Sequence, residues 1–142
     1  MPVFDNQMPP GIGAALQRVG TETMTAVSAH TTTVNLHPAV AALLDRTEPA
    51  MRSMFHGRCP EALLLSRVAV EAEASLAAEG THAPDHELVL ARMRQLLRGA
   101  VVAAMLLREP NDPHHERPIP PCSSCAPALA ALGVGILEVP AS

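Results

Sequence analysis

The clearest pattern of hydrophobic and polar positions is a helical one between residues 60 and 79. Leu65, Val68, Ala72 and Leu76 recur at the 3.6-residue period of an α-helix, while most charged residues of the stretch fall outside this stripe. The first two turns are almost wholly apolar. We therefore expect that end of the helix to be deeply buried.

Three further stretches carry helical patterns. Pro38 can open a helix at its first turn, and the apolar residues of PAVAALLDR share one face. DHELVLARMRQLLR predicts a helix that begins near Pro84 or Asp85 and is ended by Gly99. The stretch GIGAALQRVG predicts a short first helix closed by Gly20, although its two early glycines weaken helix formation.

Four stretches favour strands. TETMTAVS at 21–28 and TTTVNL at 31–36 are rich in β-branched residues and could pair as a hairpin. AVVAAMLL at 100–107 is a continuous apolar run, typical of a central strand buried on both faces. CSSCAPALAAL predicts a helix stopped by a glycine, and GILEV at 135–139 follows as a strand, which implies a right-handed parallel crossover. The predicted fold is α/β, with a sheet of about four strands.

The composition is that of a folded, mildly acidic chain. We expect a single domain over residues 1–142, with 1–20 as an N-terminal helix or arm and 21–142 as the core. Hydrophobic residues make up 48% of the chain but only two residues are aromatic, so Ala, Val, Leu and Met must build the core. The formal charge of −4 argues mildly against a nucleic-acid scaffold, because phosphate binding normally needs a basic face.

The sequence indicates no secretory signal and no membrane span. MPVFDNQMPPG lacks a cationic start followed by an apolar run, and no stretch approaches the length needed to cross a bilayer. Three cysteines cannot all pair with one another, which favours reduced thiols or metal ligands over disulfides. We therefore expect a cytoplasmic protein.

The three cysteines are compatible with three kinds of site. A structural zinc site would need a fourth ligand, which a histidine could supply. A redox-active pair at a helix N-terminus would use Cys122 and Cys125 but leave Cys59 unexplained. A catalytic metal site would use all three thiolates and leave one position open for water.

The catalytic alternative also accounts for a carboxylate. Glu61 lies two residues past Cys59, where it could reach metal-activated water without binding the metal. Both cysteine regions begin predicted helices, whose N-termini stabilise thiolates. The order Cys-x-Glu, then about sixty residues, then Pro-Cys-x-x-Cys is far more specific than any of its pieces.

The motifs CPE at 59–61 and PCSSC at 121–125 resemble the signature of the zinc-dependent cytidine deaminase-like superfamily. Their contexts, HGRCPEALLLSR and PPCSSCAPALAALGV, are similar to the YwqJ-related branch of bacterial deaminases. The resemblance implies a cytidine deaminase-like α/β/α sandwich, a mixed sheet of about four strands with the two zinc-bearing helices on one face. Pro60 stands where the family usually has Ala, which the first turn of a helix tolerates. After 135–139 the chain leaves no room for the fifth strand that many relatives carry.

The resemblance further implies hydrolytic deamination of a nucleobase. Zn²⁺ held by Cys59, Cys122 and Cys125 would lower the pKa of its bound water. Glu61 would then carry a proton to the leaving ammonia. Arg58, beside the first ligand, could offset the negative charge of three thiolates.

Five more residues are candidates for contact with the substrate. Phe55 and His56 precede the metal helix and could stack on or hydrogen-bond a base, although core packing and a satisfied histidine are commoner roles. Asn35 lies near the end of a predicted strand, where relatives can place a substrate-contacting Asn and where a turn or cap role is equally common. His114 and His115 lie in the loop before the second cysteine pair, a position that usually carries no chemistry. His56, His114 and His115 are also the candidates for the fourth ligand of a structural zinc site.

The nature of the substrate stays open. Members of the resembled branch are often toxin domains, or stand-alone proteins encoded beside immunity proteins, which suggests a nucleic-acid deaminase with an immunity partner and export by a route other than a secretory signal. The acidic charge and scarce aromatics instead favour a free nucleoside or nucleobase. A non-catalytic zinc-binding domain is the third alternative, against which the intact Glu61 argues. A homo-oligomer is compatible with all three alternatives.

Overall fold

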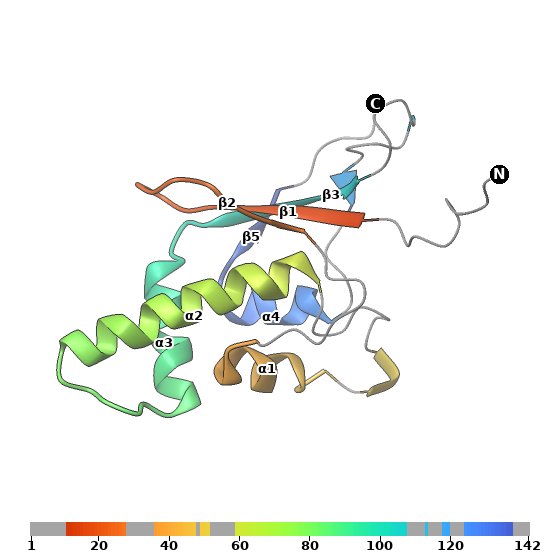
Figure 1. The fold of residues 1–142 in the computed structure, drawn as a ribbon. Helices are drawn as coiled ribbons and strands as arrows, with labels where there is room; N and C mark the ends of the chain where they lie inside the picture. Colours follow the sequence, from red (N-terminus) through yellow and green to blue (C-terminus); the bar gives the residue numbers. More distant parts are fainter. Residues whose placement is uncertain are drawn as a thin grey trace.

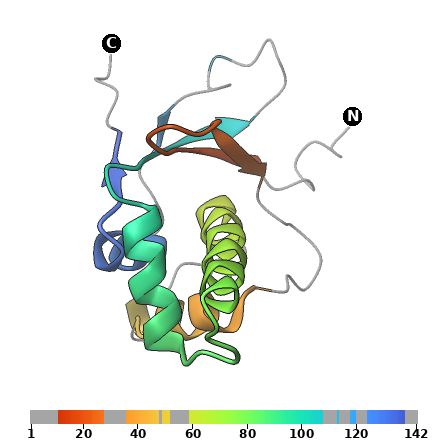
Figure 2. The same ribbon diagram turned by 90° about the vertical axis from the view of Figure 1, so that its left-hand side faces the viewer.

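The computed structural model describes residues 11–27, 36–47, 49–51, 59–107, 113, 118–119 and 124–137. Within these residues a mixed five-stranded sheet has its helices on one side (Figures 1 and 2). The mixed α/β class predicted from the sequence is therefore confirmed, as is the placement of the Cys59 and Cys125 helices on one face.

The sheet is built around β3 (Val101–Leu107). One edge of β3 pairs antiparallel with β1 (Gly11–Gln17), which in turn pairs antiparallel with β2 (Met24–Val27). The other edge is shared by β5 (Gly135–Ile136), which is parallel, and β4 (Pro118–Ile119), which is antiparallel. The parallel pairing of β3 with β5 agrees with the predicted crossover connection.

The helix predicted over GIGAALQRVG is wrong, because residues 11–17 form strand β1. Ala14 and Leu16 are buried while Ala15 and Gln17 are more exposed, which is the two-residue period of a strand. The early glycines disfavour a helix, and pairing on both edges stabilises the strand. With β1 and the short β4 included, the sheet has five strands rather than about four. The expected lack of a further strand after 135–139 stays a prediction, because residues 138–142 lie outside the described residues.

The other strand predictions fare differently. The strand predicted within 21–28 is confirmed as β2, but its partner is β1, and residues 31–35 of the predicted partner lie outside the described residues. Strand β3 is central, as predicted, and within 101–105, where burial is described, Val102 and Ala104 are the deeply buried residues. Its alternate residues are half-buried, because the described helices cover one face of the sheet only.

The helices agree closely with the sequence patterns. They are α1 (Pro38–Leu44), α2 (Pro60–Ala78), α3 (His86–Leu96) and α4 (Cys125–Ala131), with a short 3-10 turn, η2, at Pro49–Met51. Helix α2 packs against β1, β2 and α3, and α1 packs against the other three helices. In Figure 1, α2 begins at its right-hand end, near α4, and runs toward the left of the view.

Small side chains bring α2 close to the sheet. Ala14 pairs with Ala26 on one neighbouring strand and with Ala104 on the other, and all three are buried. Ala69 and Ala72 of α2 are fully buried as well. Because close-packed interiors leave few voids, methyl-sized side chains on both surfaces allow a short separation between helix and sheet.

Polar contacts fix the position of α2 further. Arg67 donates a hydrogen bond from Nη1 to the Thr25 carbonyl oxygen at 2.8 Å, and Arg18 pairs with Glu71 at 3.0 Å. Both contacts join the helix to the β1–β2 hairpin. The hairpin and α2 therefore form one unit that carries the first turn of the helix.

Candidate metal centre

Pro60 determines where helix α2 begins. Pro60 occupies the first helical position, where its missing N–H is not needed. The residue before a proline is restricted to extended backbone, and Cys59 adopts φ −69° and ψ 148° at the N-cap. Its side chain makes no capping hydrogen bond and is 1% exposed. Pro60 is thus compatible with the helix start, as expected for the first turn of a helix.

Glu61 is the second residue of α2 and the acidic residue of its first turn. It is only 3% exposed. Burial of a carboxylate is costly unless it has partners, although the positive end of the helix dipole reduces the cost. A buried Glu at this position therefore calls for an explanation beyond helix stability.

Helix α4 supplies the second cysteine. Cys125 is its first residue and Ser124 its N-cap, and both are 0% exposed. The helix ends at Gly133, as predicted: φ is +75°, and the amides of Gly133 and Val134 bond back to Ala130 and Leu129. Helix α4 follows β4 and precedes β5 in the chain, and it packs against α1.

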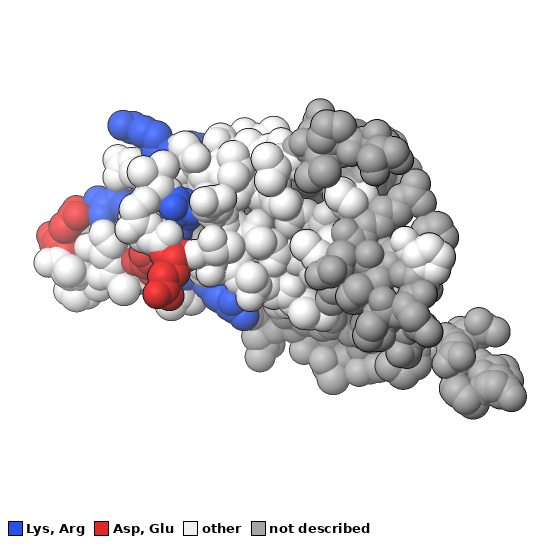
Figure 3. All heavy atoms as spheres, turned by 90° about the horizontal axis from the view of Figure 1, so that it is seen from above, with Lys and Arg blue, Asp and Glu red and all other residues white. Residues whose placement is uncertain are grey.

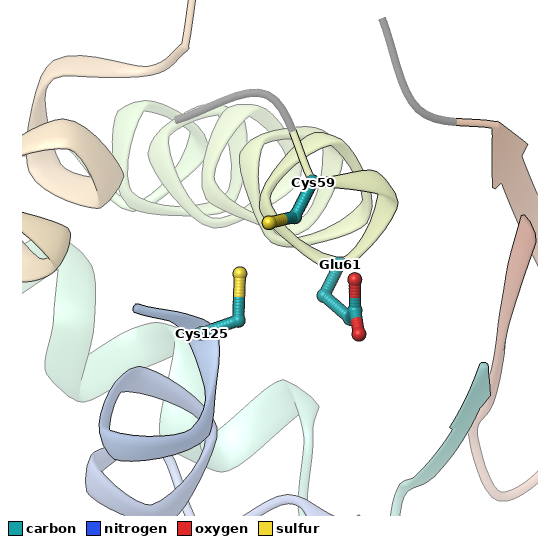
Figure 4. A group of neighbouring side chains, drawn as sticks. All are labelled: Cys59, Glu61 and Cys125. Carbon is teal, nitrogen blue, oxygen red and sulfur yellow. The ribbon is translucent and has the colours of Figure 1, made fainter. Parts of the chain in front are cut away.

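These two helix starts converge. A ligand atom from each of Cys59, Glu61 and Cys125 lies within 4.8 Å of the other two. Figure 4 shows both sulfurs directed into the space between α2 and α4, with the Glu61 carboxylate beside them. Residues that are far apart in the sequence are thus brought to one buried point.

The donor set fits a thiolate-binding metal ion. Two sulfurs that are each about 2.3 Å from a tetrahedral metal ion lie about 3.8 Å apart. That spacing falls within the 4.8 Å that encloses the three ligand atoms. Buried thiolates and carboxylates are normally paired or bound to metal. The group could therefore hold a metal ion with the two sulfurs as ligands and the carboxylate at its side.

The other predicted site residues cannot be placed. Seven of them lie outside the described residues: Asn35, Phe55, His56, Arg58, His114, His115 and Cys122. Their roles stay predictions, including that of Cys122 as the third ligand. Of the ten predicted residues, the structure describes Cys59, Glu61 and Cys125, and it brings all three together.

Ser124 was not singled out from the sequence. It is one of three polar or charged residues that are buried among the described residues, together with Glu61 and Ser66. The available signal was its place inside the CSSC motif, directly before a metal-ligand candidate at a helix N-terminus. A buried hydroxyl there belongs to the surroundings of the Cys125 thiol.

Two surface cavities of about 330 and 500 Å³ lie along α2, but neither is lined by a residue of this group. Both include His37 and Val70. Val70 comes nine residues after Glu61, which at about 100° per residue places it on the opposite side of the helix. There His37 donates its backbone N–H to Ser66 Oγ at 3.0 Å, and its Nε2 lies 2.8 Å from Glu73 Oε1. These contacts fasten the start of α1 to α2.

None of the described helices is both long enough and apolar enough to cross a membrane.

Comparison with protein families completes the picture of the site. A family model described as YwqJ-like deaminase matches residues 3–134. The match includes both cysteine segments and all but the last of the described strands. Comparisons with curated proteins and with solved structures gave no match.

Proposed function

The chain belongs to the YwqJ-like deaminase family, and from this premise we propose that it is a zinc-dependent enzyme that hydrolyses the exocyclic amine of a nucleobase. The observation that carries the proposal is the convergence of Cys59, Cys125 and Glu61 within 4.8 Å. A purely structural zinc site would have no need of the buried carboxylate.

Cys59 and Cys125 would hold the zinc ion through their sulfurs, with Cys122 as third ligand. Each of the two described cysteines stands at the start of a helix, where unpaired backbone N–H groups favour a thiolate. Zinc bound there would supply the Lewis acidity that brings the pKa of a water molecule close to neutrality. Burial of both sulfurs keeps competing water away from the ligands.

Glu61 would move the protons. Hydrolytic deamination needs a group that accepts a proton from water and later delivers one to the leaving amine. Glu61 is held in the first turn of α2 with its carboxylate beside the sulfurs, so it can reach a water molecule at the metal without occupying a ligand position (Figure 4). Its low exposure strengthens such electrostatic interactions, because the surrounding dielectric is low.

We propose a nucleic-acid substrate of the toxin type, with an immunity protein as partner, on the strength of the family. The charge of the chain favours the alternative, a free nucleoside or nucleobase. On the face drawn in Figure 3, the charged side chains of the described residues lie in one half and include both signs. Because that face offers no continuous basic track among the described residues, the choice of substrate needs an experiment.

The decisive experiment offers both substrate classes to zinc-loaded protein. Each deamination replaces an amine by an oxygen function and adds about 1 Da to the product. Product on single- or double-stranded oligonucleotides alone supports the nucleic-acid reading, and product on free nucleosides alone supports the other. Bound zinc with no product on any substrate would favour a non-catalytic domain.

Variants then test the proposed site. Replacement of Cys59 or Cys125 by Ser should lower the zinc content measured by atomic spectroscopy, because a ligand thiolate is lost. Glu61→Ala should keep the zinc but stop ammonia release. Glu22→Ala is the matched control, since it removes an exposed carboxylate from the turn between β1 and β2. A Glu61→Ala protein with full deaminase activity would contradict the proposed role.

A further inference from the structure

We infer that the metal centre is also a redox switch: in the zinc-free protein, a hydroperoxide would join Cys59 and Cys125 in a disulfide that excludes the metal. The inference rests on the proposed function only in taking these two sulfurs as zinc ligands. It concerns the regulation of the site rather than its reaction.

The two sulfurs are already close enough to react after a small movement. They lie within 4.8 Å of each other, and a disulfide bond is about 2.05 Å long, so they must approach by less than about 3 Å. Figure 4 shows them directed toward each other from two different helices. They are the two cysteines that the structure describes, and both are buried.

The helix positions allow this movement. Cys59 lies just outside α2, at the N-cap, and Cys125 is the first residue of α4. Backbone N–H groups in the first turn have no partner within the helix, so a shift at Cys59 acts on the hydrogen bond that its carbonyl accepts from the Leu63 amide, a long one at 3.3 Å. Side-chain rotation with a small displacement of one helix start is therefore enough to close the bond.

The oxidation balances with a hydroperoxide as the oxidant. One cysteine thiolate attacks the peroxide oxygen and becomes a sulfenic acid, and hydroxide leaves, or an alcohol if the peroxide is organic. The second thiolate attacks the sulfenic sulfur, the S–S bond forms, and hydroxide leaves again. Two sulfurs lose two electrons in all, and their two protons convert the two hydroxides to water.

Metal and disulfide would exclude each other. A sulfur in a disulfide is no longer a thiolate and cannot serve as an anionic ligand. Conversely, a thiolate bound to zinc has its reactive electron pair engaged. Cys59 is 1% exposed and Cys125 0%, so a small peroxide should react faster than a bulky disulfide such as oxidised glutathione.

The test follows the cross-link rather than the enzyme activity. Full-length protein is stripped of zinc with a chelator, treated with hydrogen peroxide, alkylated under denaturing conditions and digested for mass spectrometry. We expect a loss of about 2 Da and a peptide pair that joins Cys59 to Cys125. Zinc-loaded protein should react at least about tenfold more slowly. A thiol reductant should restore the zinc-binding capacity of the oxidised protein.

Variants identify the pair. Cys122→Ser is the matched control, and it should keep the 2 Da loss (about two hydrogens) and the same cross-link. Cys125→Ser should abolish both. A wild-type map that joins Cys122 to Cys125 instead, or that shows only sulfinic acid, would overturn the inference without depending on any variant.

Failure of this inference differs from failure of the proposed function. A protein that binds zinc and releases ammonia, yet forms no Cys59–Cys125 cross-link, would overturn the switch alone. A protein that forms the cross-link but binds no zinc would overturn the proposed function and leave the dithiol chemistry standing.

Discussion

Helix α2 carries a glutamate at each end, and the two carboxylates have opposite surroundings. Glu61, in the first turn, is 3% exposed and lies beside two sulfurs. The Glu79 side chain, at the C-cap, is 58% exposed and accepts hydrogen bonds from Arg92 at 2.7 and 2.8 Å. One helix thus holds a buried carboxylate where chemistry is proposed and an exposed carboxylate where a neighbouring helix docks.

The comparison separates two reasons for placing a charge. The contact of Glu79 with Arg92 links α2 to α3, and Arg92 also donates to Ser75 at 2.6 Å. That arrangement serves packing, and an exposed ion pair contributes little to stability. Burial of Glu61 carries a desolvation cost, because removal of a carboxylate from water is unfavourable. A buried charge retained at such a cost is typical of a functional site.

Replacement of glutamate by glutamine should therefore affect catalysis at Glu61 but not at Glu79. Glu61→Gln removes the proton carrier but keeps the shape of the side chain. We expect it to lower the deamination rate by about 10²–10⁴-fold, the usual contribution of general acid–base catalysis. Glu79→Gln should leave the rate unchanged. The check is steady-state ammonia release from proteins with equal zinc content, and equal losses in both variants would remove the distinction between the two ends.

Packing along α2 gives the second contrast. Leu65 is 1% exposed and Val70 is 61% exposed, although both are apolar residues of the same helix. Leu65→Ala should cost about 2–5 kcal/mol of unfolding free energy, because it leaves a cavity in the core. Val70→Ala should change it by less than about 0.5 kcal/mol. Urea unfolding monitored by circular dichroism measures both, and similar midpoints for the two variants would contradict the burial pattern.

The two ends of α2 also differ in how far sequence alone predicts them. At the C-terminal end, Gly80 adopts φ +93°, and the amides of Gly80 and Thr81 bond back to Ala77 and Leu76. Such a Schellman ending depends on a local glycine and is readable from the sequence. At the N-terminal end, the Cys-Pro-Glu order predicts the helix start and the residues of the centre. The partner Cys125 was predictable only because the full motif is specific, since local patterns carry no information on distant contacts.

Outside α2, the sequence-based predictions of the strands were limited for physical reasons. The seven residues of β1 combine two glycines, which disfavour a helix, with Ala and Leu, which favour one, so its strand state depends on pairing with β2 and β3. Strand β4 has two residues, too few for any period to show. The apolar run of β3 suggested burial on both faces, yet small and apolar residues such as Ala103 are tolerated on the less covered face. Long periodic helices, by contrast, were predicted almost to the residue.

A smaller effect on stability is expected from a substitution of Pro60, the first residue of α2. Pro60→Ala introduces the residue that the resembled motif implies at this position, and alanine is a good helix former. It should change the free energy of unfolding by less than about 1 kcal/mol and leave zinc content unchanged. Thermal unfolding and metal analysis measure the two quantities. If zinc content fell sharply, the restriction that the proline places on the Cys59 backbone would be a requirement of the site.

The smallest expected effect is that of Glu79, at the exposed end of α2, on the free energy of unfolding, and this effect depends on pH. The hydrogen bond from Arg92 is the largest cause that lowers the pKa of the Glu79 carboxyl below its ordinary value of 4.5; desolvation opposes it, and the Arg92 charge adds a still smaller lowering effect. Since the folded pKa lies below the unfolded one, the stabilisation is present above the unfolded pKa and is lost as pH falls through the folded pKa. Wild type should therefore be slightly more stable than Glu79→Gln at neutral pH, and this difference should narrow below pH 4.5 and then vanish.

Urea unfolding of both proteins from neutral to acid pH measures this difference, and added salt should reduce it because the pair is exposed. Glu22→Gln, at an exposed glutamate of the hairpin turn, is the control for the loss of one negative charge. A difference that grew toward acid pH would have the wrong sign for a carboxyl with a lowered pKa. The Glu79–Arg92 contact would then stabilise the protein through the packing of α3 on α2 rather than through its charges. In that case burial, and not charge, would determine the contribution of both ends of α2 to stability.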